Sequence, residues 1–329
     1  MRIPILFIAV LTLAMGGMAF DPLEQDDSRA LIRHFEKPAF PVGPLLQEGL
    51  FVPLEGETIT LMGGADVFQM QDCVDLDVAM ASAFPGCHLS VLNLGWSADS
   101  VYRQQRPMFF YTEIGDTREG SIPDQRGKVE PGTFVLMFGK MESLDGVGRI
   151  DEFEAAYENL IEGLQTVSQR LMLVSPVPFS GIGPAGELVE ERNEILQRYT
   201  DRIAMLAERR GLIFLNLGGF EDSMYGPGGL YLAESGQKKL ASQVSKALGW
   251  KGEWVEGVDE LVRKKNLLWS QYYRPTNWAF LFGDRQHVPS SRGHLDENQR
   301  WFVDELERLP GMIAEVEAEI SRVVKGGGR

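Results

Sequence analysis

Residues 133–138 read Thr-Phe-Val-Leu-Met-Phe, a run that is apolar almost throughout. A strand with this composition is typical of a parallel sheet that is covered by helices on both faces. Further short apolar runs occupy 58–62, 88–93, 171–174 and 212–215. We therefore predict that these five segments form one parallel sheet.

Helical patterns separate the predicted strands. Apolar residues recur at three- and four-residue spacing, which is typical of a helix with one buried face. The predicted helices cover 67–81, 150–167, 188–210 and 235–248. Gly211 and Gly249 follow the last two, and glycine is a favourable residue just after a helix. Strands that alternate with helices predict an α/β fold, a three-layer αβα sandwich with right-handed crossovers.

In such a sheet, ligands bind beyond the carboxyl ends of the strands. That rule gathers the loops 63–66, 93–99 and 139–142 around one crevice. The candidate crevice residues are Gly64, Asp66, Asn93, Trp96, Ser97, Asp99, Gly139, Lys140 and Glu142.

The segments outside the sandwich have a different character. Arg2, the uncharged apolar run 3–15 and the small residues up to Ala19 predict a signal peptide over 1–19. We therefore expect an exported protein, periplasmic or extracellular. A polar lead (20–50), the sandwich (51–250) and a helical carboxyl-terminal extension (251–329) follow, the extension ending in two helices broken near Pro310.

Composition argues against several classes of partner. The 329 residues carry a formal net charge of -15 and no basic stripe, so nucleic acid is not an expected partner. No later apolar run is long enough to span a membrane. The four histidines and two cysteines form no metal-binding motif, so no metal or cofactor is expected. Cys73 and Cys87 could form a disulfide in an exported protein, but the spacing leaves this open.

The crevice loops resemble the conserved blocks of SGNH/GDSL ester hydrolases, over roughly residues 55–250. The family's Gly-Asp-Ser nucleophile block corresponds to Gly63-Gly64-Ala65-Asp66, so Ala65 stands at the nucleophile's position. Asn93-Leu94-Gly95 matches the family's Asn-x-Gly block, which implies that Gly95 is the oxyanion glycine.

The remaining blocks depart from the family. In Gly139-Lys140-Met141-Glu142, Met141 stands where the oxyanion asparagine belongs. Gly228 and Tyr231 stand where the family has Asp and His. The segments Ser175-Pro-Val-Pro178 with Asn193, Arg274-Pro-Thr-Asn277 and Leu281-Phe-Gly-Asp-Arg285 also resemble SGNH-like proteins, the last two those exported by Planctomycetes and Verrucomicrobia.

The resemblance implies the fold of an ester hydrolase, with the five predicted strands in the order 2-1-3-4-5. The departures exclude the family's standard mechanism. Ala65 has no nucleophilic atom, Tyr231 is a poor base at neutral pH, and Met141 offers the oxyanion no donor. Other catalytic sets stay open: a hydroxyl from Ser97, Ser100 or Ser143 with His287 or His294, or the carboxylates of Asp66, Asp99 and Glu142. Lys140 is expected to pair with Glu142.

Two segments are rich in aromatic and arginine side chains, a composition that suits sugars and anionic groups. The insertion 100–131 contributes Arg106, and 271–294 contributes Arg285 and His287, all three placed at the crevice mouth. Three functions are compatible with these features: a non-catalytic protein that binds a carbohydrate or acylated polymer, a carbohydrate esterase with a rearranged site, or a periplasmic scaffold.

Overall fold

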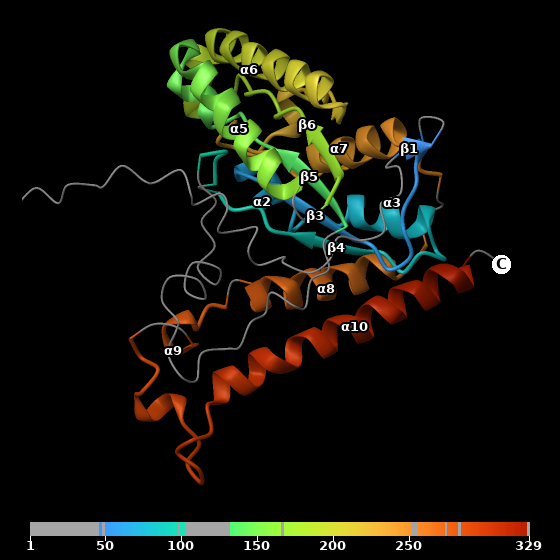
Figure 1. Ribbon diagram of the computed structural model, residues 1–329, viewed down its shortest axis with the longest axis vertical. Coiled ribbons are helices and arrows are strands. Elements are labelled where there is room, and N and C mark those ends of the chain that lie inside the picture. The colour runs from blue at the N-terminus through green and yellow to red at the C-terminus, as the bar shows by residue number, and fades with distance from the viewer. Residues whose placement is uncertain are drawn as a thin grey trace, which may run out of the picture.

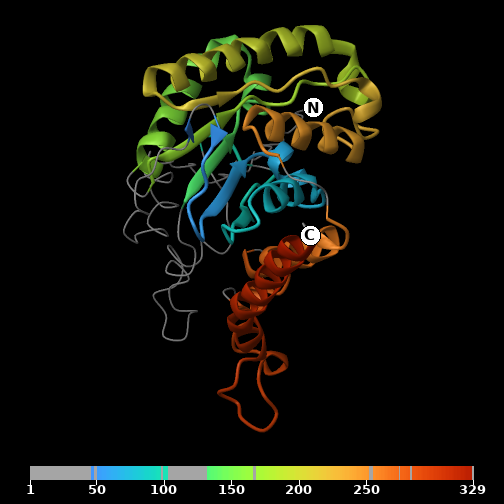
Figure 2. The same ribbon diagram turned by 90° about the vertical axis from the view of Figure 1, so that its right-hand side faces the viewer.

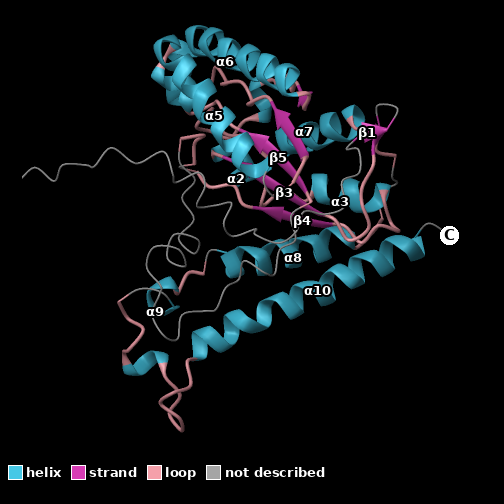
Figure 3. Cartoon of the chain, in the orientation of Figure 1, coloured by secondary structure: helices cyan, strands magenta, loops and turns pink. Residues whose placement is uncertain are grey.

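A five-stranded parallel sheet forms the centre of the computed structural model (Figures 1 and 3). The structure describes residues 46–47, 50–97, 99–102, 132–165, 168–251, 255–273, 275–281 and 284–327. The strands are β3 (Thr58–Gly63), β4 (Ser90–Asn93), β5 (Thr133–Met137), β6 (Arg170–Val174) and β7 (Ile213–Leu215). They lie in the order β4-β3-β5-β6-β7 and every pairing among them is parallel. Counted along the chain this is 2-1-3-4-5, so the predicted order is confirmed.

Helices cover both faces of the sheet, which confirms the three-layer αβα architecture (Figure 2). One face carries α5 (Ile150–Gln165) and α6 (Val189–Arg210); the other carries α2 (Ala65–Gln69), α3 (Asp75–Ala83) and α7 (Glu234–Ala247). The extension consists of α8 (Val258–Tyr273), α9 (Trp278–Leu281) and α10 (Trp301–Gly327). The minor elements are β1 (Leu46–Gln47), β2 (Leu50–Phe51) and the 3-10 turns η3 (Glu142–Asp145), η4 (Val147–Arg149), η5 (Gly183–Leu188), η6 (Asp222–Met224) and η7 (Pro289–Ser291).

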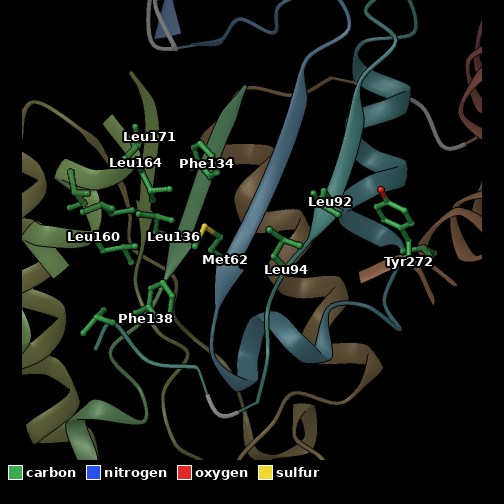
Figure 4. Packing of buried hydrophobic residues seen from close by; sticks show 14 of the residues in the cluster. Met62, Leu92, Leu94, Phe134, Leu136, Phe138, Leu160, Leu164, Leu171 and Tyr272 are labelled. Atoms are coloured by element: carbon green, nitrogen blue, oxygen red, sulfur yellow. The ribbon is translucent and has the colours of Figure 1, made fainter. Parts of the chain in front are cut away.

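Alternate residues of the central strands enter two separate cores. Phe134 and Leu136 of β5 pack toward α5 in the first core, which Figure 4 shows. Met137 of the same strand packs toward α7 in the second core. Because side chains alternate across a strand, a run buried on both faces must be apolar at nearly every position, as 133–138 is.

Two predicted helical segments are built differently from expectation. The pattern over 67–81 is split into α2 and α3. Val67 of α2 belongs to the second core, whereas α3 presents Val78 to the first core and Leu76 and Met80 to the second. Conversely, the two helices predicted around Pro310 are the single helix α10.

Packing explains why α10 continues through Pro310. A proline inside a helix removes one backbone hydrogen bond and costs about 3 kcal/mol. Leu306, Leu309 and Ile313 on either side of it are buried, and α10 packs along α8. Burial of each such side chain contributes about 1.5–3 kcal/mol, which offsets the cost.

A buried ion pair joins the amino ends of three strands. Arg170 Nε, at the start of β6, donates to Glu57 Oε1 at 2.6 Å, and both side chains are almost fully buried. Thr133 Oγ1, at the start of β5, donates to the same oxygen at 2.6 Å. Arg170 Nη2 also donates to Val52 O at 2.6 Å, so the segment that leads into β3 is held to the same cluster. Nothing in the sequence pattern indicated this cluster.

The extension attaches to the sandwich beside β4 and α3. Asp77 of α3 accepts from Asn266 Nδ2 at 3.0 Å and lies 3.4 Å from Lys265 Nζ, and Ser90 donates to Glu317. Cys73 and Cys87 are both free thiols in the structure, and burial raises the pKa of Cys73 to about 12. Among the described residues, no helix combines the length and apolarity needed to cross a membrane. The predicted signal peptide lies outside the described residues.

A cavity of about 40 Å³ interrupts the second core between the sheet and α3 and α7. Its lining includes Val135 at the middle of β5. Missing packing of this volume costs about 1 kcal/mol, at roughly 24 cal/mol per Å³.

We predict that Val135→Ile stabilises the protein by about 0.5–1 kcal/mol, because the added methylene enters empty space. The midpoint of thermal unfolding should rise by about 1–4 °C. Val78→Ile is the control: Val78 is fully buried in the first core and takes no part in this cavity. Overpacking there should destabilise the protein, and equal effects of the two variants would contradict the prediction.

Candidate functional site

Glycines let the loops at the carboxyl edge of the sheet approach one another closely. A Cβ on Gly63 would lie 2.3 Å from Met137 O, and one on Gly64 would lie 2.8 Å from Asp99 O. A Cβ on Gly95 would lie 2.7 Å from Phe68 N in α2. The loops after β3, β4 and β5 are therefore in direct contact, as the topology of a parallel sheet requires.

Ala65 begins α2 at the end of β3 and is only 3% exposed. Its neighbour Asp66 is joined to Lys140, which follows Gly139, so the loops that carry Ala65 and Gly139 touch. Within the described residues this position offers a buried methyl group and no hydroxyl.

Lys140 pairs with Asp66, not with Glu142 as predicted. Its Nζ donates to Asp66 Oδ1 at 3.0 Å and to Leu230 O at 2.6 Å, and it lies 5.4 Å from the centre of the Phe179 ring. Both charged side chains are buried. The Lys140 side chain extends toward the loop before α7. There it reaches the Asp66 carboxylate and the Leu230 carbonyl, and it makes no ion pair with Glu142.

Glu142 instead holds two crevice loops together. Its Oε1 accepts from Val101 N at 2.8 Å, and its Oε2 accepts from Gly139 N at 2.9 Å. Burial of the carboxyl raises the pKa of Glu142 above its usual range, although these two backbone hydrogen bonds favour the charged form. The predicted carboxylate set does not share one open site, since Asp66 and Glu142 are each engaged in separate buried contacts.

The loop after β4 uses its polar groups internally. Gly95 N, the oxyanion donor that the family resemblance implies, donates to Asn93 Oδ1 at 2.8 Å. Asn93 Nδ2 donates to Val67 O at 2.7 Å, which anchors the loop on α2. Trp96 is half-buried and packs edge-on against Phe68, with ring centres 5.8 Å apart.

The three candidate serines differ in environment. Ser143 is buried and donates to Lys140 O at 2.7 Å, as a turn-capping hydroxyl does. Ser100 is half-buried, and Ser97 is exposed. Asp99 is buried next to them.

The turn before α7 forms the far side of the crevice. Gly228 is exposed and Tyr231 is half-buried, with its carbonyl accepting from Gly226 N at 2.9 Å. A Cβ on Gly229 would lie 2.0 Å from Ile182 O, and its φ of +69° also favours glycine. The turn is therefore packed tightly onto the loop after β6.

Of the three predicted binding residues outside the crevice, the structure describes Arg285 and His287, and these two lie away from the crevice loops. Arg106 lies outside the described residues. Arg285 and His287 are exposed and lie between α9 and α10, at the end of the extension that projects away from the sheet (Figures 1 and 2). They are displaced because α8 and α10 run alongside each other and carry their connecting segment beyond the sandwich. His294, the other histidine considered as a base, belongs to the same exposed segment.

Phe179 was not among the predicted site residues, and Asn193 was noted only as part of the family resemblance. The Phe179 ring lies under the Lys140 ammonium, and Asn193 fixes that phenylalanine by accepting from Phe179 N at 2.8 Å and donating to Phe179 O at 2.9 Å. The resemblance of Asn193 to the family pattern was the available signal. Among the described residues, no three His, Cys, Asp or Glu side chains are arranged to hold a metal ion.

Comparison with known proteins gives likeness at the level of structure alone. No family model and no curated protein matches the chain. Among solved structures, a gut microbial diltiazem-metabolizing enzyme is similar with a TM-score of 0.47 and 15% identity over 62% of this chain. The chain spans 50% of that enzyme's length.

The acetylxylan esterase Axe2 from Geobacillus stearothermophilus is similar with a TM-score of 0.44 and 15% identity. This match covers 62% of this chain and 98% of the esterase. With TM-scores below 0.5, these likenesses establish neither a family nor an activity for this chain.

We predict that Lys140→Met destabilises the protein by about 3–5 kcal/mol, because it leaves the Asp66 carboxylate buried without its partner. The double variant Asp66→Leu/Lys140→Met removes both charges and should recover most of that loss. Urea denaturation of the four proteins in the cycle measures the coupling. A double variant whose loss of stability equals the sum of the losses in the two single variants would show that the pair is not coupled.

We predict a pH dependence that belongs to Glu142. Its pKa is raised in the folded protein, so between its ordinary value of 4.5 and the folded value the native state binds more protons than the unfolded state. The free energy of unfolding of the wild type, relative to Glu142→Gln, should therefore fall as pH rises through this interval and then level off. Urea denaturation of both proteins from about pH 4 to about pH 8 measures the difference, and a constant difference would refute the assignment.

Proposed function

We propose that this protein is an exported, non-catalytic relative of SGNH hydrolases that binds a carbohydrate or an acylated polymer at the carboxyl edge of its sheet. The observation that supports this best is the position of Lys140. Its ammonium joins Asp66, beside the nucleophile's position, to Leu230, beside the position of the catalytic base. The Lys140–Asp66 ion pair thus lies between the loop after β3 and the loop before α7. In the family that the sequence resembles, these two loops carry the nucleophile and the base.

The groups that acyl transfer requires are missing or engaged. Ala65 provides no nucleophile, and Gly95 N already donates to Asn93 Oδ1. Nucleophile, base and oxyanion donors act as a unit, and removing the nucleophile or the base of a triad lowers turnover by roughly 10⁴- to 10⁶-fold. Binding energy from the rest of the crevice does not compensate for such losses.

Aromatic surfaces on both sides of the crevice support a binding role. Trp96 is held edge-on by Phe68, which fixes its ring while leaving part of it accessible. Tyr231 is half-buried in the turn on the opposite side, and the exposed Ser97 hydroxyl follows Trp96. Rigid aromatic faces with nearby hydroxyls suit the apolar faces and hydroxyl groups of sugars. Export is proposed from the charged start and apolar run of residues 1–19.

The test combines an activity assay with a binding assay on the purified protein. We expect no hydrolysis of p-nitrophenyl acetate above background and no labelling by a fluorophosphonate. We expect binding to acetylated or deacetylated xylan, weakened at least tenfold by Trp96→Ala, which is about 1.4 kcal/mol. Trp301→Ala is the matched control, because Trp301 is a partly exposed tryptophan on the extension.

Two outcomes would overturn the proposal. Turnover that a fluorophosphonate blocks and that Ser97→Ala abolishes would establish an active hydrolase with a rearranged site. Failure to bind any polysaccharide in a panel that includes both forms of xylan would remove the binding role.

A further inference from the structure

The cavity in the second core runs along the strands of the sheet. From β5 it is lined by Thr133, Val135 and Met137, so it spans four steps along one strand. At about 3.3 Å per residue this is a length of roughly 13 Å. The remaining lining comes from β3, β4 and β6 on one side and from α2, α3, α7 and the segments next to them on the other.

The exposure of Val135 supports the presence of this space independently. Val135 lies in the middle of β5, which is flanked by β3 and β6 on its two sides. Its neighbours Phe134 and Leu136 are fully buried, yet Val135 retains accessible surface. A residue at the centre of a covered sheet is accessible only if the layer above it leaves a gap.

The lining is apolar and adaptable. Four methionines line the cavity: Met70, Met80, Met137 and Met172. Methionine is unbranched and has three rotatable bonds, so these side chains can repack to widen a narrow slot. The Thr133 hydroxyl already donates to Glu57 Oε1, and the cavity has no ionisable residue in its lining. Water or a polar ligand would therefore find too few hydrogen-bond partners there.

Shape and chemistry together point to one class of ligand. A space of about 40 Å³ spread over about 13 Å is narrow, which favours an unbranched chain over ring systems and branched groups. An extended chain with C–C bonds of about 1.5 Å rises about 1.25 Å per carbon, so about ten carbons span the slot. We propose that this slot between the sheet and α3 and α7 binds one unbranched aliphatic chain, at a site separate from the crevice.

Aromatic side chains line the slot at the amino edge of the sheet. Phe51 and Trp250 line that end and meet edge-on, with ring centres 5.9 Å apart. Phe51 belongs to the two-residue strand β2, and its backbone N donates to Leu248 O at 3.2 Å. Trp250 is half-buried beyond the end of α7. The other end is closed by Val67 and Met70 around α2, under the crevice floor.

The test follows the methionines directly. The full chain, labelled with ¹³C at the methionine methyl groups, is titrated with decanoate below its micellar concentration. We expect saturable shifts of the Met70, Met80, Met137 and Met172 signals, each assigned by a Met→Leu variant. The signals of Met205 and Met312, which are exposed on α6 and α10, serve as controls and should not move.

Variants that fill the slot make the test specific. Val135→Phe should weaken decanoate binding at least tenfold, as measured by calorimetry. If that protein does not fold, Val91→Ile/Val135→Ile replaces it, because both valines line the cavity and the added methylenes are small. Val78→Ile, in the first core, should leave binding unchanged.

The source of the chain is distinguished by its head group. Decanoate, decan-1-ol and methyl decanoate share one ten-carbon chain, so the proposal predicts that all three bind. Tighter binding of decanoate indicates that the ligand is a free fatty acid. Tighter binding of methyl decanoate indicates that the ligand is an acyl ester. The proposal would be overturned if the chemical shifts of all four lining methionines stayed unchanged during the titration. It would also be overturned if the wild type and the filled variant bound decanoate with equal affinity. Neither result bears on polysaccharide binding at the crevice.

Discussion

Burial of the central strands on both faces is the constraint on which the rest of this structure depends. Because β3 and β5 pack against helices on either side, polar groups are confined almost entirely to the strand ends. Arg170 and Glu57 pair at the amino edge, and Lys140 and Asp66 pair at the carboxyl edge. Each buried pair fixes several loops at once, and removing one partner leaves an uncompensated charge in the interior.

The loops at the carboxyl edge of the sheet are held together by close backbone approach and by buried polar contacts. Glycines at 63, 64, 95 and 229 make that approach sterically feasible. The polar atoms at the edge, however, satisfy one another. Gly95 N donates to Asn93, Glu142 accepts from two backbone amides, and Lys140 connects the loop after β3 to the turn before α7.

Two features separate this chain from a minimal sandwich. The extension uses Asn266 and Lys265 to bind Asp77, so its attachment depends on polar contacts with α3 as well as on apolar packing. The second core contains an apolar slot lined by four methionines, whereas in the first core the aromatic side chains Tyr157 and Phe153 pack edge-on against each other. The side chains that can repack most easily therefore lie on the face of the sheet that α3 and α7 cover.

The sequence by itself determined the five strands and the covering helices α5, α6 and α7, because the two-sided apolar run at 133–138 and amphipathic patterns such as that at 150–167 have few alternative structures. It also indicated that Ala65 replaces a nucleophile. Only the tertiary structure decided that Lys140 pairs with Asp66, that α10 continues through Pro310, and that Arg285 and His287 project away from the sheet. Periodicity specifies which face of an element is buried, but a contact between residues 74 positions apart depends on how the loops pack in three dimensions.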